Sequence, residues 1–273
     1  MRHRTFNDEG EEDLVFVMGF GNRWTHENVS WLVGTLANAG YRVHTFELPT
    51  NIDDFKADWL EPVAEYVVDL EEYQLLAHSA GSLVAQALDG ADNHVYLSPW
   101  WGYNERVPDP VLDLLSQIPT SAPFLPRGET DKSAIGDLAT DHQLATSPKW
   151  VSPSFVRETR RAQGDLLAID HDAVVFCSLK DPIIDHQSIG ERVPPQHVVL
   201  YDGGHELFSS SVRDQYVGLL LTALEGGAHA IEAAHGIYTL EASEDRGDAV
   251  DADAGADADT DAGDEADAVD VSN

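Results

Sequence analysis

Short apolar runs alternate with longer segments of helical periodicity along the first hundred residues of this chain. Residues 14–18, 41–46, 73–78 and 94–97 have the length and pattern of strands. Between them, apolar residues recur at helical spacing, as in 28–39, where Gly40 ends the pattern. Such strict alternation predicts a mostly parallel sheet with right-handed crossovers and helices on both faces.

Two features interrupt this alternation. Pro62 lies inside the second helical pattern and predicts a kink there. Residues 100–168 then contain scattered prolines, short helix-like pieces and no clear strand. So long a connection without structure is improbable in a compact domain, and we expect a helical lid inserted here, although a plain connection fits the same pattern. Strands resume at 173–178 and 197–201, and a last amphipathic helix ends at 226–227.

These boundaries divide the chain into five parts. We expect an N-terminal arm over 1–13, an α/β core over 14–99 and 169–226, and the helical insertion over 100–168. The pattern does not decide the structure of an extension over 227–240. Residues 241–273 repeat Asp, Ala and Gly with too few apolar side chains for a core, and we expect a disordered acidic tail.

One stretch is a candidate for chemistry. The run 73–78 stops at a cluster of small residues around Ser79, and helical spacing starts at Leu83. Ser79 therefore lies on a sharp turn from a strand into a helix, which requires small residues two positions before and after it. Ala77 and Gly81 hold those positions. A tight turn with a surface serine fits the same residues, so the interpretation depends on partners elsewhere in the chain.

Residues 77–81 resemble the nucleophile elbow of the α/β-hydrolase superfamily, with Ala77 in place of the usual first glycine. As a fold pattern, the resemblance covers roughly residues 14–226. It implies an α/β-hydrolase fold with a lid after the strand at 94–97. It also implies hydrolysis of an ester, thioester, amide or related acyl bond through an acyl-enzyme, with no cofactor and no metal.

Three groups occur in the chain order serine, acid, histidine: Ser79, Asp181 and His205. Each follows a predicted parallel strand, and the carboxyl ends of such strands form one crevice. An imidazole oriented by a carboxylate can take the proton of a serine hydroxyl. Asp185 is a rival for the carboxylate, and ordinary turn residues fit at these positions too. The Lys-Asp-Pro and Gly-Gly-His settings resemble the acid and histidine loops of the family.

The negative oxygen formed by attack on a carbonyl needs two N–H donors. The N–H of Ala80, at the start of the helix, is one. Residues 18–21 resemble the His-Gly-x-Gly of the family with Met18 in place of histidine, which implies the N–H of Phe20 as the second. The paired glycines also suggest a phosphate loop, but the third glycine of a dinucleotide fingerprint is missing.

Three neighbouring side chains have more than one possible role. Trp100 and Trp101 directly follow the strand next to the elbow. They fit the lining of an apolar acyl pocket, and equally a contact between the insertion and the core. We expect His78 to point away from the site and to be structural.

The charge balance narrows the choice of partners and source. Lys and Arg number 16 against 49 Asp and Glu, a formal charge of −33, which argues against nucleic acid or an anionic membrane as a partner. An acid-rich, lysine-poor composition resembles that of cytoplasmic proteins in salt-loving microbes, and predicts a halophilic archaeal source. Cys177 stands alone, and no signal peptide or membrane-spanning run is visible. We therefore expect a soluble, cytoplasmic protein.

Together these observations predict a serine hydrolase of the carboxylesterase type, acting on a small-molecule acyl substrate. Ser79 would be the nucleophile, His205 the general base and acid, and Asp181 the orienting carboxylate. An acyl transferase or a carbon–carbon bond hydrolase with the same triad is an alternative. A non-catalytic binding protein on the same fold is another, although it would not need all three groups. The sequence does not specify the oligomeric state.

Overall fold

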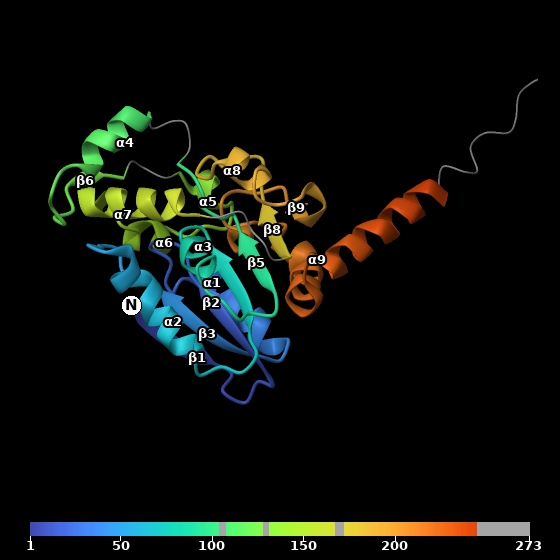
Figure 1. The fold of residues 1–273 in the computed structure, drawn as a ribbon. Helices are drawn as coiled ribbons and strands as arrows, with labels where there is room; N and C mark the ends of the chain where they lie inside the picture. The colour runs from blue at the N-terminus through green and yellow to red at the C-terminus, as the bar shows by residue number, and fades with distance from the viewer. Residues whose placement is uncertain (104–107, 128–130, 167–171, 245–273) are drawn as a thin grey trace, which may run out of the picture. The chain divides into compact units, whose positions relative to one another are not determined.

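The computed structural model describes residues 1–103, 108–127, 131–166 and 172–244 (Figure 1). Contacts divide the chain into two units, residues 1–235 and residues 236–273. In the second unit only 236–244 are described, and they are helical. Apart from the end of α9, the features described below belong to the first unit.

A seven-stranded sheet organises the first unit. Its strand order is β1 (Arg2–Phe6), β3 (Tyr41–Glu47), β2 (Glu12–Val17), β4 (Gln74–His78), β5 (His94–Leu97), β8 (Ala173–Cys177) and β9 (Val198–Leu200). All neighbours are parallel except β1, which pairs antiparallel with β3 and places Arg2 opposite Glu47. The predicted mostly parallel sheet is confirmed. Strand β1 was not predicted, because the sequence analysis assigned residues 1–13 to an arm.

Helices cover both faces of the sheet. Consecutive residues of a strand point to opposite faces, so they pack against different helices. Val15 and Val17 of β2 pack with side chains of α2 (Glu61–Val67) and α3 (Gly81–Ala85). Leu14 and Phe16 pack on the other side with α1 (Glu27–Asn38) and α9 (Arg213–Glu244). Burial on both faces explains why the central strands are continuous apolar runs.

The irregularity expected at Pro62 is present just before it. Residues Lys56–Leu60 form a π-helical turn, η1, in which the N–H of Glu61 donates to the carbonyl of Lys56, five residues back. Helix α2 follows, with Pro62 in its first turn. Proline is accepted there because the first N–H groups of a helix have no helical acceptor.

The segment between β5 and β8 contains several helices in its described residues. It contains α4 (Asp109–Ser116), α5 (Lys132–Ile135), α6 (Asp141–Thr146) and α7 (Pro153–Gly164). It also contains a two-stranded antiparallel sheet, β6 (Leu125–Pro126) and β7 (Trp150–Val151), which the sequence analysis did not predict. Figure 1 shows α4, β6 and α7 gathered to one side of the main sheet. We call residues 100–168 the insertion.

Three short helices and α9 complete the fold. The three short helices are α8 (His186–Gly190), η2 (Pro195–His197) and η3 (Leu207–Ser209). Gly227 has φ +60° and interrupts α9 at the predicted stop, but the helix then resumes to Glu244, four residues into the predicted tail. The remainder of that tail, 245–273, lies outside the described residues. None of the helices in the described part is long and apolar enough to cross a membrane.

Candidate active site

The turn between β4 and α3 is tightly packed around Ser79. Ser79 has φ +50°, in the left-handed region that residues with side chains rarely adopt. A Cβ added to Gly81 would lie 2.3 Å from the carbonyl oxygen of Val17, so no larger residue fits there. Ala77 is fully buried on the strand side. Gly81, the small residue two positions after Ser79, is therefore required by the close approach of α3 to β2.

Ser79, Asp181 and His205 come together from three separate loops. The Nε2 atom of His205 lies 2.8 Å from the Oγ of Ser79, and its Nδ1 lies 2.7 Å from the Oδ2 of Asp181. A carboxylate only accepts, so Nδ1 carries the proton and Nε2 presents its lone pair to the serine hydroxyl. In this tautomer the imidazole can accept the proton of Ser79.

Asp181 is held as a charged acceptor. Burial alone would raise the pKa of Asp181, but its interactions with His205 and the N–H groups of Ile183 and Ile184 outweigh burial and lower the pKa below its usual value. The second oxygen, Oδ1, accepts from the N–H of Ile183 at 2.8 Å. The rival Asp185 instead caps α8, where it accepts from the N–H of Gln187 and the hydroxyl of Ser188.

The loop that carries His205 is fastened to the insertion. The N–H of His205 donates to the carbonyl of Ala134 at 2.8 Å, and that of Glu206 donates to Ile135 at 2.8 Å. A Cβ on Gly204 would lie 2.7 Å from the backbone of Ile135, which explains the second glycine of the Gly-Gly-His sequence. The imidazole is therefore placed partly by a segment about seventy residues earlier in the chain, the helix α5.

The N–H groups of Ala80 and Phe20 follow the carboxyl ends of the neighbouring strands β4 and β2. Ala80 is the N-cap of α3, and neither its N–H nor that of Phe20 donates a hydrogen bond among the described residues. Phe20 lies in a turn closed by the N–H of Asn22, which donates to the carbonyl of Gly19 at 3.0 Å. Such free donors are what an oxyanion site requires.

His78 does not point away from the triad, so the expectation that it would is wrong. Its ring centroid lies 4.9 Å from that of His205, and its Nδ1 lies 2.8 Å from the Oδ1 of Asn22. Burial, and then the proximity of His205, lower the pKa of His78 well below its usual value. The ring therefore stays neutral beside the imidazole of His205.

The two tryptophans after β5 have different surroundings. Trp101 is buried in the core with its ring 5.0 Å from that of Tyr96. Trp100 is only half-buried and belongs to an aromatic group with Phe20, Tyr103 and Phe155 of α7. Of the two tryptophans, only Trp100 retains exposed surface of any size.

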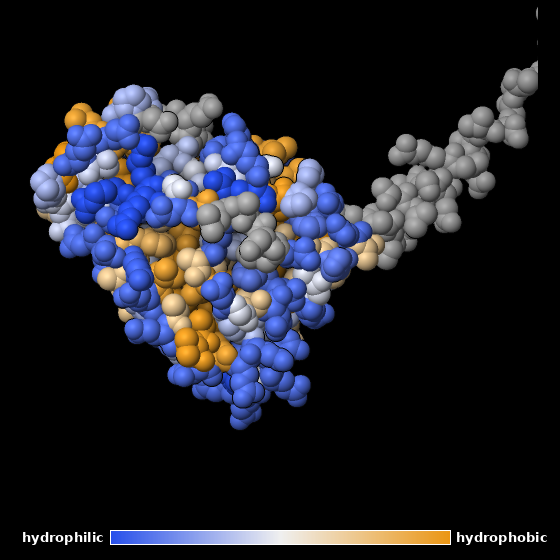
Figure 2. Space-filling view, in the orientation of Figure 1, coloured by the Kyte–Doolittle hydropathy of each residue, from blue (hydrophilic) through white to orange (hydrophobic). Residues whose placement is uncertain are grey.

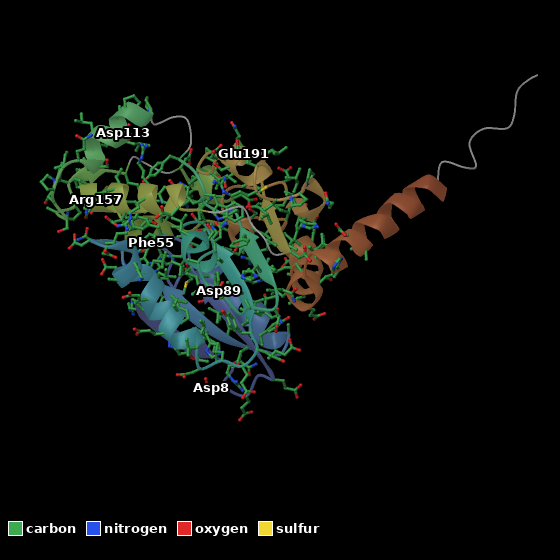
Figure 3. All side chains as sticks on the ribbon, viewed as in Figure 1. Asp8, Phe55, Asp89, Asp113, Arg157 and Glu191 are labelled. Atoms are coloured by element: carbon green, nitrogen blue, oxygen red, sulfur yellow. The ribbon has the colours of Figure 1, made fainter. Side chains whose placement is uncertain are left out.

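The segment after β3 also contacts the insertion. There the N–H of Phe55, which is labelled in Figure 3, donates to Glu158 of α7 at 3.4 Å.

Comparison with known protein families identifies the family of this chain. The chain matches the alpha/beta hydrolase family over residues 14–219, which is most of its length. The protein belongs to the α/β-hydrolase family. No curated protein matches it by sequence. Among the described residues of this hydrolase, no group of three His, Cys, Asp or Glu side chains could hold a metal ion.

Solved structures share the fold of this α/β hydrolase at low sequence identity. A soluble variant of monoglyceride lipase from Saccharomyces cerevisiae is 13% identical, with 81% of this chain and 90% of that chain covered and a TM-score of 0.64. The monoacylglycerol lipase of Paleococcus ferrophilus is 13% identical, with 85% and 98% covered and a TM-score of 0.61. An esterase from Exiguobacterium antarcticum is 14% identical, with 82% and 95% covered and a TM-score of 0.58.

Sequence reasoning missed several polar residues of this hydrolase site. Asn22, Gln143 and Glu206 form a buried hydrogen-bonded chain behind His78 and His205. The hydroxyl of Tyr201 lies 2.8 Å from the carbonyl oxygen of Gly204, beneath the histidine loop. Single polar residues form no repeating pattern, and only the position of Glu206 directly after His205 could have drawn attention to it.

Proposed function

We propose that this α/β hydrolase is a serine hydrolase of the carboxylesterase type, which cleaves an ester or related acyl bond through an acyl-enzyme on Ser79. One observation carries the proposal. The imidazole of His205 bridges the Ser79 hydroxyl at 2.8 Å and the Asp181 carboxylate at 2.7 Å. This arrangement can move a proton from oxygen to nitrogen at neutral pH and stabilise the resulting imidazolium.

The proposed reaction has two halves. In the first, Oγ of Ser79 attacks the acyl carbon while Nε2 of His205 takes the hydroxyl proton and then gives it to the leaving group. The N–H groups of Phe20 and Ala80 stabilise the negative oxygen, and each such donor contributes about 3 kcal/mol to transition-state stabilisation. In the second half, water deprotonated by His205 attacks the acyl-enzyme and releases the acid.

An apolar acyl or alcohol group is the substrate part that the surroundings favour. Phe20 of the oxyanion turn packs on Phe155 of the insertion, with ring centroids 4.6 Å apart, and the ring of Trp100 stacks with that of Phe155 at 6.2 Å. Aromatic side chains gain most from contact with apolar surface. These contacts support a role for the insertion as a lid and for Trp100 as a substrate-binding residue.

We also propose a halophilic archaeal source and a cytoplasmic location. The support is the formal charge of −33 with only 16 Lys and Arg. Hydrophilic side chains cover most of the surface seen in Figure 2. In concentrated salt, screening removes the self-repulsion that such a charge would cause in dilute buffer.

A fluorophosphonate probe in molar KCl tests the proposed function. The wild-type protein should become labelled, and Ser79→Ala should not. Hydrolysis of p-nitrophenyl esters and acyl-CoA thioesters should fall by at least about 10⁴-fold in Ser79→Ala. Labelling that persists in this variant would refute Ser79 as the nucleophile. A wild type that neither labels nor hydrolyses would favour a binding protein on the same fold.

A further inference from the structure

Glu206 is a buried carboxylate beside the catalytic histidine. Its side chain points into the protein and accepts three hydrogen bonds: from Asn22 Nδ2 at 2.8 Å, from Gln143 Nε2 at 2.8 Å and from Ser209 Oγ at 2.5 Å. A buried carboxylate is costly unless its oxygens are fully bonded. The three donors meet this requirement, and they come from the oxyanion turn, from α6 of the insertion and from η3 after the histidine loop.

The carboxylate fixes the orientation of the Asn22 amide. Because Glu206 can only accept, Asn22 must direct its NH₂ group towards it, and the amide oxygen then faces His78. The opposite orientation would bring two acceptors to 2.8 Å from each other. The acceptor Oδ1 in turn requires a proton on Nδ1 of His78, 2.8 Å away.

This tautomer determines what His78 presents to its surroundings. With the proton on Nδ1, the Nε2 atom of His78 is an unprotonated nitrogen that makes no hydrogen bond among the described residues. The backbone of His205 is close enough to act on the pKa of His78 in the upward direction, but burial and the imidazole of His205 outweigh it. A buried lone pair without a donor is easier to accommodate than a buried N–H or a charge. The neutral ring packs 4.9 Å from His205 and adds no positive charge to oppose the imidazolium that forms there during catalysis.

The same amide holds the oxyanion turn. Asn22 closes the turn that contains Phe20, and its side chain is bound at both ends, by Glu206 and by His78. Gly19 makes room for this contact, because a Cβ there would lie 2.4 Å from Nδ1 of His78 and 2.8 Å from Oδ1 of Asn22. A turn fixed in this way keeps the N–H of Phe20 in place before the substrate arrives, which is what oxyanion stabilisation requires.

We propose that Asn22 and Glu206 are positioning residues that together fix the neutral Nδ1–H form of His78 and the oxyanion turn. The catalytic part of this inference rests on the proposed serine hydrolase function. Neither residue touches the reacting atoms. Each acts through a neighbour: Glu206 through Asn22, and Asn22 through His78 and the turn around Phe20. We call the Glu206–Asn22–His78 chain the brace.

The tautomer of His78 tests the brace without any turnover. Two-bond ¹H–¹⁵N spectra of histidine-labelled protein distinguish the two neutral forms, and His78→Asn identifies the signals by their loss. The wild type should show a single neutral form protonated at Nδ1, and Asn22→Leu should lose this preference. A wild-type His78 protonated at Nε2, or charged, would overturn the proposal.

Kinetics per labelled site test the consequence for catalysis. In Asn22→Leu we expect kcat per fluorophosphonate-labelled site to fall roughly 10- to 100-fold, with KM changed less than about threefold, because misplaced groups weaken transition-state contacts. Asn22→Ser, which is too short to reach both partners, should show the same loss if the leucine variant does not fold. Values within about twofold of wild type in the folded variants would overturn the proposal.

Asn93→Leu is the matched control. Asn93 also bridges separate segments, donating to Gln74 at 3.1 Å and to the carbonyl of Leu224 at 3.0 Å, but it lies before β5 at the opposite end of the strands. Its replacement should lower stability and leave kcat per labelled site unchanged. Absence of labelling and hydrolysis in wild type would refute the proposed function, while the His78 spectra would still decide on the brace.

Discussion

Ser79 is held in its unusual backbone conformation by hydrogen bonds at its own peptide groups. Its N–H donates to the carbonyl of Leu97 at 3.0 Å. Its carbonyl oxygen accepts from the hydroxyl of Ser82 at 2.6 Å and from the N–H of Trp100 at 3.2 Å. A left-handed φ costs a residue with a Cβ about 1–2 kcal/mol, so these bonds must outweigh that cost.

This strain predicts an unusual order of stability among variants at position 79. Ser79→Gly should be more stable than Ser79→Ala by roughly 0.5–1 kcal/mol, because glycine adopts φ +50° without a steric penalty. Ser30, exposed in α1, is the control, since there alanine should be the more stable of the two. Chemical denaturation of the four variants measures both differences. The same order at both positions would contradict the strain.

At the residue scale, the meeting of Ser79, Asp181 and His205 could be predicted because each follows a strand and all lie at one edge of the sheet. The sequence did not allow Asn22, Glu206 or the direction of His78 to be predicted. The contacts of these side chains depend on how loops from distant parts of the chain pack together, and local pattern carries no information about that.

Helix α6 contacts the start of α1, and His26 lies in this contact. His26 is fully buried, with Nε2 2.9 Å from the hydroxyl oxygen of Thr146. That hydroxyl donates to the carbonyl of His142, so it accepts from His26, whose Nδ1 has no partner among the described residues. Burial, and then the proximity of His142 and Arg23, lower the pKa of His26 to about 4.

The contact should therefore weaken in acid. A folded-state pKa below the unfolded value means that the unfolded chain binds the proton first, so stability is complete above about pH 6.5 and is lost as pH falls towards 4. Allowing for solvent screening, we expect wild type to lose about 2 kcal/mol more than His26→Gln between pH 7 and pH 4. Urea denaturation at each pH measures this. The exposed His229, changed to Gln, should make no such difference.

Elements with strong periodicity were predictable, and short ones were not. The parallel strands are apolar because both faces are covered, so their runs stand out in the sequence. Strand β1 is an edge strand with exposed charged residues, and β6 and β7 have two residues each. Such elements form because partners are already in place, and their own sequences do not specify them.

Negative charge is concentrated at the amino ends of the strands, away from the triad. A groove there is lined by eight acidic residues: Glu11, Glu12, Asp13, Asp69, Glu71, Glu72, Asp92 and Glu225. Like charges this close repel each other in dilute buffer. In 1 M salt the Debye length falls to about 3 Å, and this repulsion is largely screened.

We therefore expect the melting temperature of the whole molecule to rise by several degrees between 0.1 M and 2 M KCl. The double variant Glu71→Gln/Glu72→Gln should be more stable than wild type at low salt and gain less from added KCl. The control Glu65→Gln/Glu191→Gln removes the same charge outside the groove and should change the salt response less. A melting temperature independent of KCl would contradict electrostatic destabilisation.

At the scale of the whole molecule, the composition shows an excess of negative charge. It does not show where in the fold that charge is concentrated. The acidic residues of the groove come from Glu11 and the start of β2, the segment after α2, the loop before β5, and α9, so their meeting is a property of the fold. The same holds for the insertion. Its helical character was visible in the sequence, whereas its hydrogen bonds to the histidine loop depend on the packed structure.

Those bonds restrict how the enzyme can be re-engineered. The backbone N–H of His205 donates to the carbonyl of Ala134. Ala134 lies within the segment that a protein engineer would remove first to widen the entrance. Excising 100–168 would remove this support of His205 instead of uncovering its side chain. A wider entrance should therefore be made by changing α4 or α7. The stretch from Lys132 to Thr146, which includes α5 and α6, should be kept because it supports the histidine loop.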